Sequence, residues 1–332
     1  MEKFKRDNNQ IYVDDLDNNE DSNHYLRPLE LFENKELVKI SAPMVRYSKL
    51  AFRSLVRKYD CDLAFTPMIM SDSFVRSVKA RNSEFTTNAA DRPLVVQFAA
   101  SNAKDFADAT EIVLPYSDGV DLNCGCPQKW ALKEGVGASL IQKPNLLADM
   151  VRQARFRVPS SEFTISIKIR IHDDIRQTVE MCRQAEQMGI SWVTVHGRTV
   201  QQRTQPVNIA AISTIKDSLA IPVVANGDIC SLQDAEWVQA ATGVDGVMAA
   251  RGLLANPAMY SGYQVTPQAC VQDWVAASLQ LGTPFTYFHH HLAYMLDTLC
   301  SRPQKRLLNC LSSTAAVLDF LENHMNIMLT TP

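Results

Sequence analysis

The sequence predicts a (β/α)8 TIM barrel followed by a small all-helical domain. From residue 38 to residue 250, short β-branched apolar runs alternate with amphipathic segments of helix length. Continuous apolar runs between helices are typical of parallel strands that are buried on both faces. There are eight such runs, and eight units favour a closed barrel over a doubly wound open sheet. After residue 258 the apolar residues recur only at helical spacing.

The eight predicted strands are defined by their apolar runs and by the helix-length segments that separate them. In chain order they are LVKISA (37–42), DLAFT (62–66), PLVVQF (93–98), GVDLN (119–123), FTISIKI (163–169), WVTVH (192–196), IPVVAN (221–226) and GVMAA (246–250).

Three regions are expected. Residues 1–37 are acidic, with ten Asp or Glu against five Lys or Arg, and are expected to be a mobile tail that ends in a docking segment near residues 29–32. Residues 38–258 are expected to form the barrel. Residues 259–332 are expected to form the helical domain, whose apolar periodicity is clearest in 272–281, 285–301 and 306–325.

Composition narrows the class of protein. A chain of 332 residues with 46% hydrophobic content can bury one large core and still supply a second domain. No run of eighteen apolar residues occurs, and the polar start MEKFKRDNNQ lacks the apolar stretch of a secretory signal. Eight cysteines without a CxxC pair are expected to be reduced thiols. We therefore expect a cytoplasmic or nuclear protein with no membrane partner.

The charges are unevenly distributed. A net charge of −3 argues against binding to nucleic acid by bulk electrostatics, yet residues 44–81 carry eight Lys or Arg against three Asp. Five of the eight lie on a predicted amphipathic helix, where solvated charges are ordinary. Arg76, Lys79 and Arg81 follow the second strand in a less regular segment, which makes them candidate RNA contacts.

The residues that follow each predicted strand are polar, basic or glycine. Barrel enzymes carry their chemistry at the carboxyl ends of the strands, so these residues are expected to converge on one rim. In strand order they are Pro43-Met44, Thr66-Pro67-Met68, Gln97, Asn123 to Pro127, Lys168 with Arg170, His196 to Arg198, Asn226 to Asp228, and Ala250 to Gly252.

The last two strand ends suit a phosphate group. Loops after strands 7 and 8 of such barrels often bind phosphate through glycine-bearing backbone and the start of a helix. Asn226-Gly227-Asp228 and Arg251-Gly252 have this character, although Asn-Gly is also an ordinary tight turn. Lys168 would add an ammonium group at the same rim, but a lysine that ends a strand is commonly just solvated.

The segment DLNCGCP brings two thiols to the mouth of the fourth strand. Metal binding is disfavoured because no third and fourth ligand have compatible spacing, and a CxC redox pair would be unusual on a barrel rim. A single catalytic acid or nucleophile fits better, with Cys126 held by the following proline and His196 available from the sixth strand. Cys124 is the better candidate for a merely buried thiol.

Taken together, the motifs resemble those of the tRNA-dihydrouridine synthases from about Ile40 through the C-terminal helices. Their order, together with FHHHLAYML and RPQKR, is most similar to the eukaryotic branch acting on D-loop uridines 20a and 20b. The matching motifs are APM (42–44), Gln97, DLNCGCP (121–127), KIR (168–170), HGRT (196–199), ANGDI (225–229) and ARG (250–252).

This resemblance implies a barrel that binds FMN, a helical domain that recognises tRNA, and NADPH or NADH as the reductant. Asn123 and Arg170 would bind the uracil, hydride would pass from the flavin to C6, and Cys126 would protonate C5. A monomer without a metal is expected, with Arg302, Lys305 and Arg306 as a second RNA-binding patch. The residues around FMN would be Pro43, Met44, Gln97, Asn123, Lys168, His196, Asn226, Gly227, Asp228, Ala250 and Arg251.

Two departures from the family pattern remove no chemical role. Ala250 stands where many members have glycine, and residues 200–212 lack a glycine and a tryptophan that are common elsewhere in the family. Two rival functions remain open. One is an FMN barrel oxidoreductase acting on a free pyrimidine, against which the helical domain and HGRT argue; the other is a non-catalytic tRNA-binding paralogue, against which Cys126, Lys168 and His196 argue.

Overall fold

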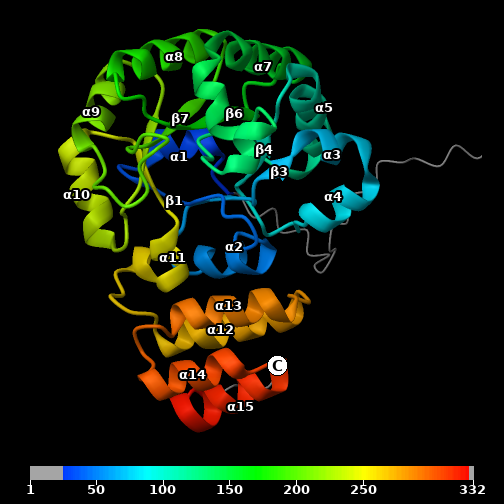
Figure 1. The fold of residues 1–332 in the computed structure, drawn as a ribbon, viewed down its shortest axis with the longest axis vertical. Helices are drawn as coiled ribbons and strands as arrows, with labels where there is room; N and C mark the ends of the chain where they lie inside the picture. The colour runs from blue at the N-terminus through cyan, green and yellow to red at the C-terminus, as the bar shows by residue number, and fades with distance from the viewer. Residues whose placement is uncertain (1–24, 329–332) are drawn as a thin grey trace, which may run out of the picture.

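The protein is a closed barrel of eight parallel strands with a helical module at one side (Figure 1). The computed structural model describes residues 25–328. The barrel closes because β2 pairs with both β1 and β4, which confirms the predicted fold class. Its strands are β1 (Val38–Ser41), β2 (Leu63–Phe65), β4 (Leu94–Ala99), β5 (Gly119–Cys124), β6 (Thr164–Arg170), β7 (Trp192–His196), β8 (Val223–Asn226) and β9 (Gly246–Ala249).

The register of the neighbouring strands aligns the predicted site residues. Asn123 of β5 is paired with Lys168 of β6, and Arg170 of β6 with His196 of β7. His196 is in turn paired with Asn226 of β8. Because adjacent strands lie about 4.8 Å apart, this register brings five polar residues from four strands to one edge of the barrel.

A ninth strand was not predicted. The two residues of β3 (Ile69–Met70) pair with Phe98 and Ala99 of β4, beyond the end of β2. Two residues are too few to give a recognisable apolar period. The segment that follows forms two short helices, α3 (Ser71–Arg76) and α4 (Val78–Glu84), where the sequence suggested irregular structure.

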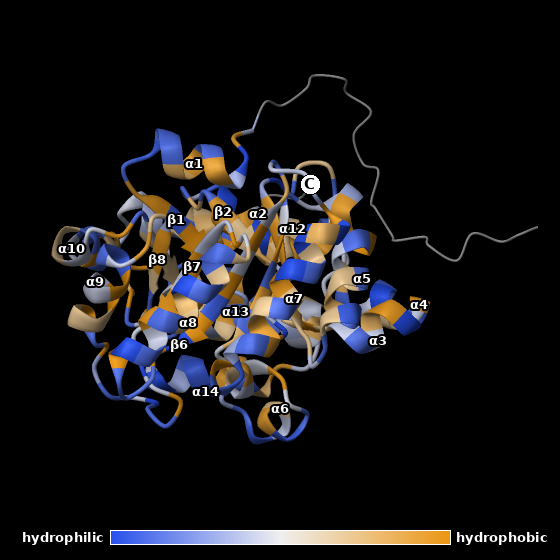
Figure 2. Ribbon diagram, turned by 90° about the horizontal axis from the view of Figure 1, so that it is seen from above, coloured by the Kyte–Doolittle hydropathy of each residue, from blue (hydrophilic) through white to orange (hydrophobic). Residues whose placement is uncertain are grey.

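Helices surround the strands, and the apolar residues concentrate at the centre of the molecule (Figure 2). Side-chain hydrogen bonds cap the start of several helices. The Asn102 side chain accepts a hydrogen bond from the backbone N–H of Asp105, and the Ser231 side chain accepts one from the backbone N–H of Asp234. The helical elements of the barrel are α2 (Leu50–Arg57), α5 (Ala103–Val113), η1 (Leu114–Tyr116), α6 (Lys129–Lys133), η2 (Gly137–Gln142), α7 (Pro144–Arg157), α8 (Ile175–Gln187), α9 (Ile209–Asp217), α10 (Leu232–Thr242), α11 (Arg251–Ala255) and η3 (Met259–Ser261).

One further helix, α1 (Pro28–Asn34), packs at the amino ends of the strands. The ring of Phe32 lies 5.5 Å from that of Trp192, the first residue of β7, and also lies beside Gly246, the first residue of β9. The helix therefore covers the end of the barrel opposite the polar rim. The earlier part of the acidic tail, residues 1–24, lies outside the described residues.

The helical module consists of α12 (Gln268–Gln280), α13 (Phe285–Met295), α14 (Arg302–Cys310) and α15 (Thr314–Met325). It lies beside α2 and α11 in Figure 1, with α12 packed on α2 and α13 packed on α11. The apolar pattern of 306–325 belongs to two helices. Ser313 starts the second by accepting a hydrogen bond from the backbone N–H of Ala316.

His291 joins this module to the barrel. Its ring stacks on Phe52 of α2 at 4.5 Å and lies 4.4 Å from the ring of Trp274. Burial lowers the pKa of His291 to about 3, so the imidazole is neutral. Its Nε2 lies 3.2 Å from the carbonyl oxygen of Tyr47 and donates to it, which ties α13 to the loop between β1 and α2.

All eight cysteines are unpaired. Within residues 25–328 no three His, Cys, Asp or Glu side chains gather where they could share a metal ion. No helix in the same range is long and apolar enough to cross a membrane.

Candidate active site

A chain of hydrogen bonds under the rim begins at Asp121, a fully buried residue of β5. One of its carboxylate oxygens accepts from Ser166 Oγ at 2.7 Å, and the other accepts from Gln97 Nε2 at 2.8 Å. Gln97 Oε1 accepts in turn from Asn123 Nδ2 at 2.8 Å. Because a carboxylate can only accept, Asp121 fixes the orientation of both amides.

The chain ends at the loop that carries Cys126. Asn123 Oδ1 accepts from the backbone N–H of Gly125 at 3.2 Å and from that of Cys126 at 3.0 Å. From the other side, Ala138 N donates to the carbonyl oxygen of Cys126, and a Cβ on Gly137 would lie 2.8 Å from that oxygen. The backbone of the thiol residue is therefore held by β5 and by η2.

The two thiols of DLNCGCP lie in different environments. Cys124 is fully buried, and burial raises the pKa of its thiol well above the ordinary value. Cys126 is partly exposed and packs against a small cluster of Ala99, Ala131 and Val136. Only Cys126 is therefore placed to meet a ligand at the rim.

Lys168 is partly buried beside β8. Its Nζ donates to Asn226 Oδ1 at 2.8 Å, and Asn226 Nδ2 donates to the carbonyl oxygen of Met248 at 2.7 Å. Burial, with a contribution from Arg170, lowers the pKa of Lys168 to about 8, while Asp121 opposes that shift. The lysine is fixed in place rather than freely solvated.

Arg170 links two rim loops. It is buried, its Nε donates to the carbonyl oxygen of Gly125 at 3.1 Å, and its Nη1 donates to those of Thr199 and Gln202 at 2.7 and 2.9 Å. Burial lowers its pKa. The Nη2 group forms no hydrogen bond with the described residues, so it is the part of the guanidinium that can bind a substrate.

His196 is a neutral ring among cations. Burial, together with the positive charges of Lys168, Arg170 and Arg198, lowers its pKa to about 2. Arg198 Nη1 lies 3.3 Å from His196 Nε2. A guanidinium can only donate, so this geometry assigns the ring proton to Nδ1.

The loops after β8 and β9 enclose a small cavity of about 80 Å³. Gly227 has a φ of +119°, and a Cβ there would lie 2.9 Å from the His196 ring. A Cβ on Gly252 would lie 2.4 Å from the carbonyl oxygen of Ile229. Both positions require glycine. Without a Cβ, the backbone at Gly227 packs closely against the His196 ring, and the backbone at Gly252 packs closely against the loop after β8.

Two arginines face the Asp228 carboxylate in this cavity. Arg198 is buried and forms an ion pair with it, and exposed Arg251 lies 3.5 Å from its other oxygen. Arg251 would have to release Asp228 to bind a phosphate with full strength. The cavity thus fits a phosphate through backbone N–H groups and Arg251, with Asp228 as a competing acceptor.

The first and last strands complete the rim. Ala42 N donates to the carbonyl oxygen of Ala249, which sets Pro43 and Met44 beside the end of β9. The backbone N–H of Met44 donates to Ser48 Oγ at 3.0 Å. Ala250 precedes the first residue of α11 and is partly exposed. The predicted flavin-facing residues therefore come from the same end of the barrel.

Arg81 is not available for RNA, contrary to the sequence-based expectation. It is 5% exposed, and its Nη1 donates to the carbonyl oxygens of Phe74 and Val75 at 2.8 and 3.0 Å. The side chain fastens α4 to the end of α3. The sequence could not reveal this because the two short helices were not recognised.

The other candidate RNA contacts lie at the surface. Arg76 is exposed but paired with Asp105 at 3.1 Å, and Lys305 is paired with Asp297 at 2.8 Å. Lys79, Arg302 and Arg306 are exposed and form no ion pair within residues 25–328. These three are the freest cations of the two predicted patches.

Sequence reasoning missed the roles of Asp121, Ser166 and Arg198. Asp121 and Arg198 stand inside the quoted motifs, and a buried acid beside a buried amide could have been suspected from the strand alternation. The contact of Ser166 with Asp121 depends on the register between β5 and β6, which the sequence does not specify.

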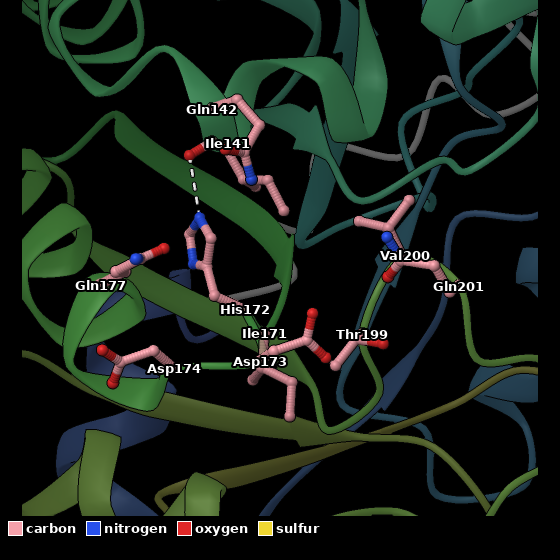
Figure 3. Close-up of a pocket in the computed structure, with 10 residues that line it drawn as sticks. All are labelled: Ile141, Gln142, Ile171, His172, Asp173, Asp174, Gln177, Thr199, Val200 and Gln201. Atoms are coloured by element: carbon pink, nitrogen blue, oxygen red, sulfur yellow. Dashed lines mark hydrogen bonds between the residues drawn. The ribbon is translucent and has the colours of Figure 1, made fainter.

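A separate cavity of about 290 Å³ lies outside this site, beyond the ends of β6 and β7 (Figure 3). Asp173 and Asp174 contribute to its wall. Figure 3 shows His172 pointing to the carbonyl oxygen of Ile141, and its other nitrogen contacts Thr178 Oγ1 at 2.9 Å. Both ring nitrogens of His172 therefore have a hydrogen-bond partner. None of the predicted site residues lines this cavity.

Fold and site together define a β/α barrel whose polar rim combines a partly exposed thiol, a fixed lysine and a phosphate-sized cavity. The family model described as dihydrouridine synthase (Dus) matches residues 40–324, and the chain belongs to this family.

Curated relatives agree with this assignment, and a solved structure shares the fold. A mouse protein named tRNA-dihydrouridine(20a/20b) synthase [NAD(P)+]-like is 61% identical over 297 residues, covering 90% of this chain and 92% of that protein. The Schizosaccharomyces pombe tRNA-dihydrouridine(20a/20b) synthase [NAD(P)+] is 40% identical over 301 residues, covering 90% of this chain and 91% of that protein. Histamine dehydrogenase from a Rhizobium species shares the barrel fold alone. The two structures align with a TM-score of 0.50 and 10% identity, covering 72% of this chain and 49% of that one.

Proposed function

We propose that the protein is a tRNA-dihydrouridine synthase that uses FMN and NADPH or NADH to reduce uridines 20a and 20b of the D-loop. The names of the mouse and fission yeast relatives, which match nine tenths of this chain, support the substrate and the reductant. The observation that carries the proposal is the position of Cys126. Its loop is bonded to Asn123, which is paired in register with Lys168.

The residues of the rim fit FMN. Arg251 and the close-approaching backbone at Gly227 and Gly252 suit its phosphate, and Lys168 and Asn226 would lie against the flavin. Neutral His196 would donate from Nδ1, the nitrogen that Arg198 leaves free. When bound and reduced, FMN would supply the hydride that C6 of the uracil ring needs.

Asn123 and Arg170 are positioned to orient the uracil. Each retains donor groups that bond to no described residue: one N–H of Asn123 Nδ2, and Arg170 Nη2. Such donors suit the two carbonyl oxygens of a uracil ring. The Arg170 charge would also stabilise negative charge that develops on the ring as hydride arrives.

Cys126 acts as the general acid. Its partly exposed thiol transfers a proton to C5 after C6 has received hydride, and the product is 5,6-dihydrouridine. The thiolate is left beside the cations Lys168 and Arg170, which stabilise it until it is reprotonated from solvent. Cys124 is too deeply buried for this role.

The base must leave its stack to reach the rim, because the ring atoms are inaccessible within folded RNA. The tRNA would approach this end of the barrel, with Arg76 and Lys79 on the barrel side and Arg302, Lys305 and Arg306 on the helical module. These are few cations for a polyanion, so we expect binding that depends on shape as well as on charge.

The test is to incubate FMN-loaded protein and NADPH with unmodified tRNA, with uridine and with free uracil. Dihydrouridine in tRNA alone supports the proposal. Reduction of a free pyrimidine with tRNA left untouched favours a small-molecule barrel oxidoreductase. Tight tRNA binding without reduction of any substrate favours a non-catalytic tRNA-binding protein.

A further inference from the structure

A third, larger cavity lies between the barrel rim and the helical module. It has a volume of about 560 Å³, within the range of ligand-binding pockets. Its walls come from four regions: the loop after β1 with the start of α2, the loop after β2, the end of α4 with the residues just after it, and the turn between α12 and α13 with the start of α13. None of the residues predicted to bind FMN or uracil lines it.

This cavity adjoins the site that carries Cys126. Its wall includes Val45 and Arg46, directly after Met44 in the chain, and Met68 after β2. Met68 packs against the same cluster of Ala99, Ala131 and Val136 as Cys126 does. The cavity and the thiol therefore border the same small apolar cluster.

The lining suits a flat, uncharged ring with a phosphate at the opening. Leu50, Pro67, Met68, Leu281 and Tyr287 give it apolar and aromatic surface. Ser83, Thr86 and Thr283 add neutral polar groups, and Lys49 is bonded to the carbonyl oxygen of Ser83 and paired with Glu84.

One cation of the lining is uncommitted. Arg46 is exposed and forms no hydrogen bond or ion pair with any residue in the range 25–328. Its φ of +73° places it in the left-handed region, which non-glycine residues seldom occupy. Such a conformation at a ligand-facing loop is typical of functional positions.

The barrel and the helical module, which together form the walls of this cavity, are packed against each other. His291 donates to the carbonyl oxygen of Tyr47, and its ring stacks on Phe52. The loop after β1 is thereby fixed to α13, and the turn that precedes α13 forms the opposite wall. The cavity is thus formed by packing that does not depend on a ligand.

We propose that this cavity binds the base of the nucleotide that adjoins the target uridine, with Arg46 on its phosphate, while the target itself meets Cys126. The inference rests on the proposed function, in which two consecutive uridines are substrates. An enzyme that reduces either of two neighbours must place one at the thiol and the other close beside it. A pocket next to the rim meets that need and lets the RNA shift by one nucleotide.

The experiment is a binding cycle that needs no reductant. Wild type and Thr283→Trp, which fills the cavity from the α12 to α13 turn, are titrated with intact tRNA. They are also titrated with two tRNAs that each carry an abasic nucleotide at 20a or at 20b. Leu279→Trp, exposed near the end of α12 and outside the lining, is the matched control.

For wild type and Leu279→Trp, at least one abasic tRNA should bind about tenfold more weakly than intact tRNA, the size of one lost base-stacking contact. Thr283→Trp should bind intact tRNA about tenfold more weakly and should not distinguish it from the abasic tRNAs. Ser83→Trp, on the opposite wall, should behave in the same way and serves if Thr283→Trp does not fold. Arg46→Asn, whose new residue tolerates the left-handed backbone, should weaken all three tRNAs equally.

The proposal is overturned if the filled variants bind intact tRNA as wild type does, or if base removal costs them a further tenfold. It is also overturned if filling slows flavin reduction by NADPH and spares tRNA binding, which would assign the cavity to the nicotinamide dinucleotide. A failure of the proposed function would look different, because the binding cycle would hold while no dihydrouridine formed.

Discussion

The side-chain oxygen of Asn123 accepts a hydrogen bond from the backbone N–H of Cys126 at 3.0 Å. The same asparagine donates to Gln97, which donates to the buried carboxylate of Asp121. The position of the thiol is therefore set by a residue deep in the barrel and not by its own loop alone.

Cys126→Ala should separate the two halves of the reaction. The variant should bind FMN and accept hydride from NADPH as wild type does, because the thiol is needed only once hydride has reached the uracil. Dihydrouridine formation should fall by about 10² to 10⁴, the range for loss of a general acid. Rapid-mixing measurements of flavin reduction and of reoxidation by tRNA check both. Cys124→Ala should remain largely active, and an inactive Cys124→Ala beside an active Cys126→Ala would reverse the assignment.

Asp121→Asn should lower turnover by about ten- to a hundredfold, the cost of losing one hydrogen bond to a charged group. An amide can donate as well as accept, so Gln97 and Asn123 would no longer be held in one orientation. Ser166→Ala is the matched control. It removes one donor to the same carboxylate but leaves the bond from Gln97 Nε2 in place, so it should cost less than Asp121→Asn. Equal rates for all three proteins would show that these hydrogen bonds do not position Cys126.

The same residue predicts a pH dependence. Burial raises the pKa of Asp121 to about 6, although the hydrogen bonds from Gln97 and Ser166 lower it. Both oxygens accept hydrogen bonds, so protonation must remove one of them. Turnover of wild type should therefore fall as the pH drops through about 6, and Asp121→Asn should lack this step. A step of equal size in the variant would assign the titration to another group.

The pKa of Lys168 predicts that FMN affinity falls at alkaline pH. Burial lowers its pKa to about 8, so its positive charge is present below that pH and is lost as the pH rises through it. FMN should bind the apoprotein more weakly above pH 8, because an anionic ligand loses its cationic partner. Lys168→Met should bind FMN weakly at every pH and without this step. Titration of apoprotein with FMN from pH 7 to 9.5 measures both.

Arg81 and Lys79 should behave differently although they stand two residues apart. Lys79→Ala should reduce the slope of log affinity for tRNA against log salt by about 0.7 to 0.9, as expected for one phosphate contact. Arg81→Ala should leave the slope unchanged and lower the melting temperature, because it removes donors to the carbonyl oxygens of Phe74 and Val75. A changed slope for Arg81→Ala would mean that the guanidinium reaches RNA.

All eight strands of the barrel could be predicted because buried parallel strands are apolar along their whole length. The convergence of Asn123, Lys168 and His196 followed from the rule that barrel strands end at one rim. The charge state and hydrogen-bond partners of side chains could not be predicted in the same way. Arg81 was expected at the surface and is buried, because its environment depends on two short helices without a clear period.

The hydrogen bonds of Asp121 depend in the same way on which strands are neighbours and in which register. The β2 to β4 pairing and the β5 to β6 register follow from closure of the whole sheet. Local sequence carries little information on either. The sequence therefore predicted a thiol at the rim, and the structure added the buried residues that hold the loop of Cys126 in place.

If this chain reduces D-loop uridines through Cys126, the dihydrouridine found in tRNA must depend on that thiol. The most direct measurement maps dihydrouridine in tRNA from cells that lack the protein and are resupplied with wild type or with Cys126→Ala. We expect dihydrouridine at positions 20a and 20b to be lost without the protein, to return with wild type and not to return with Cys126→Ala. Dihydrouridine that persists at both positions without the protein, or that returns to the wild-type level with Cys126→Ala, would contradict it.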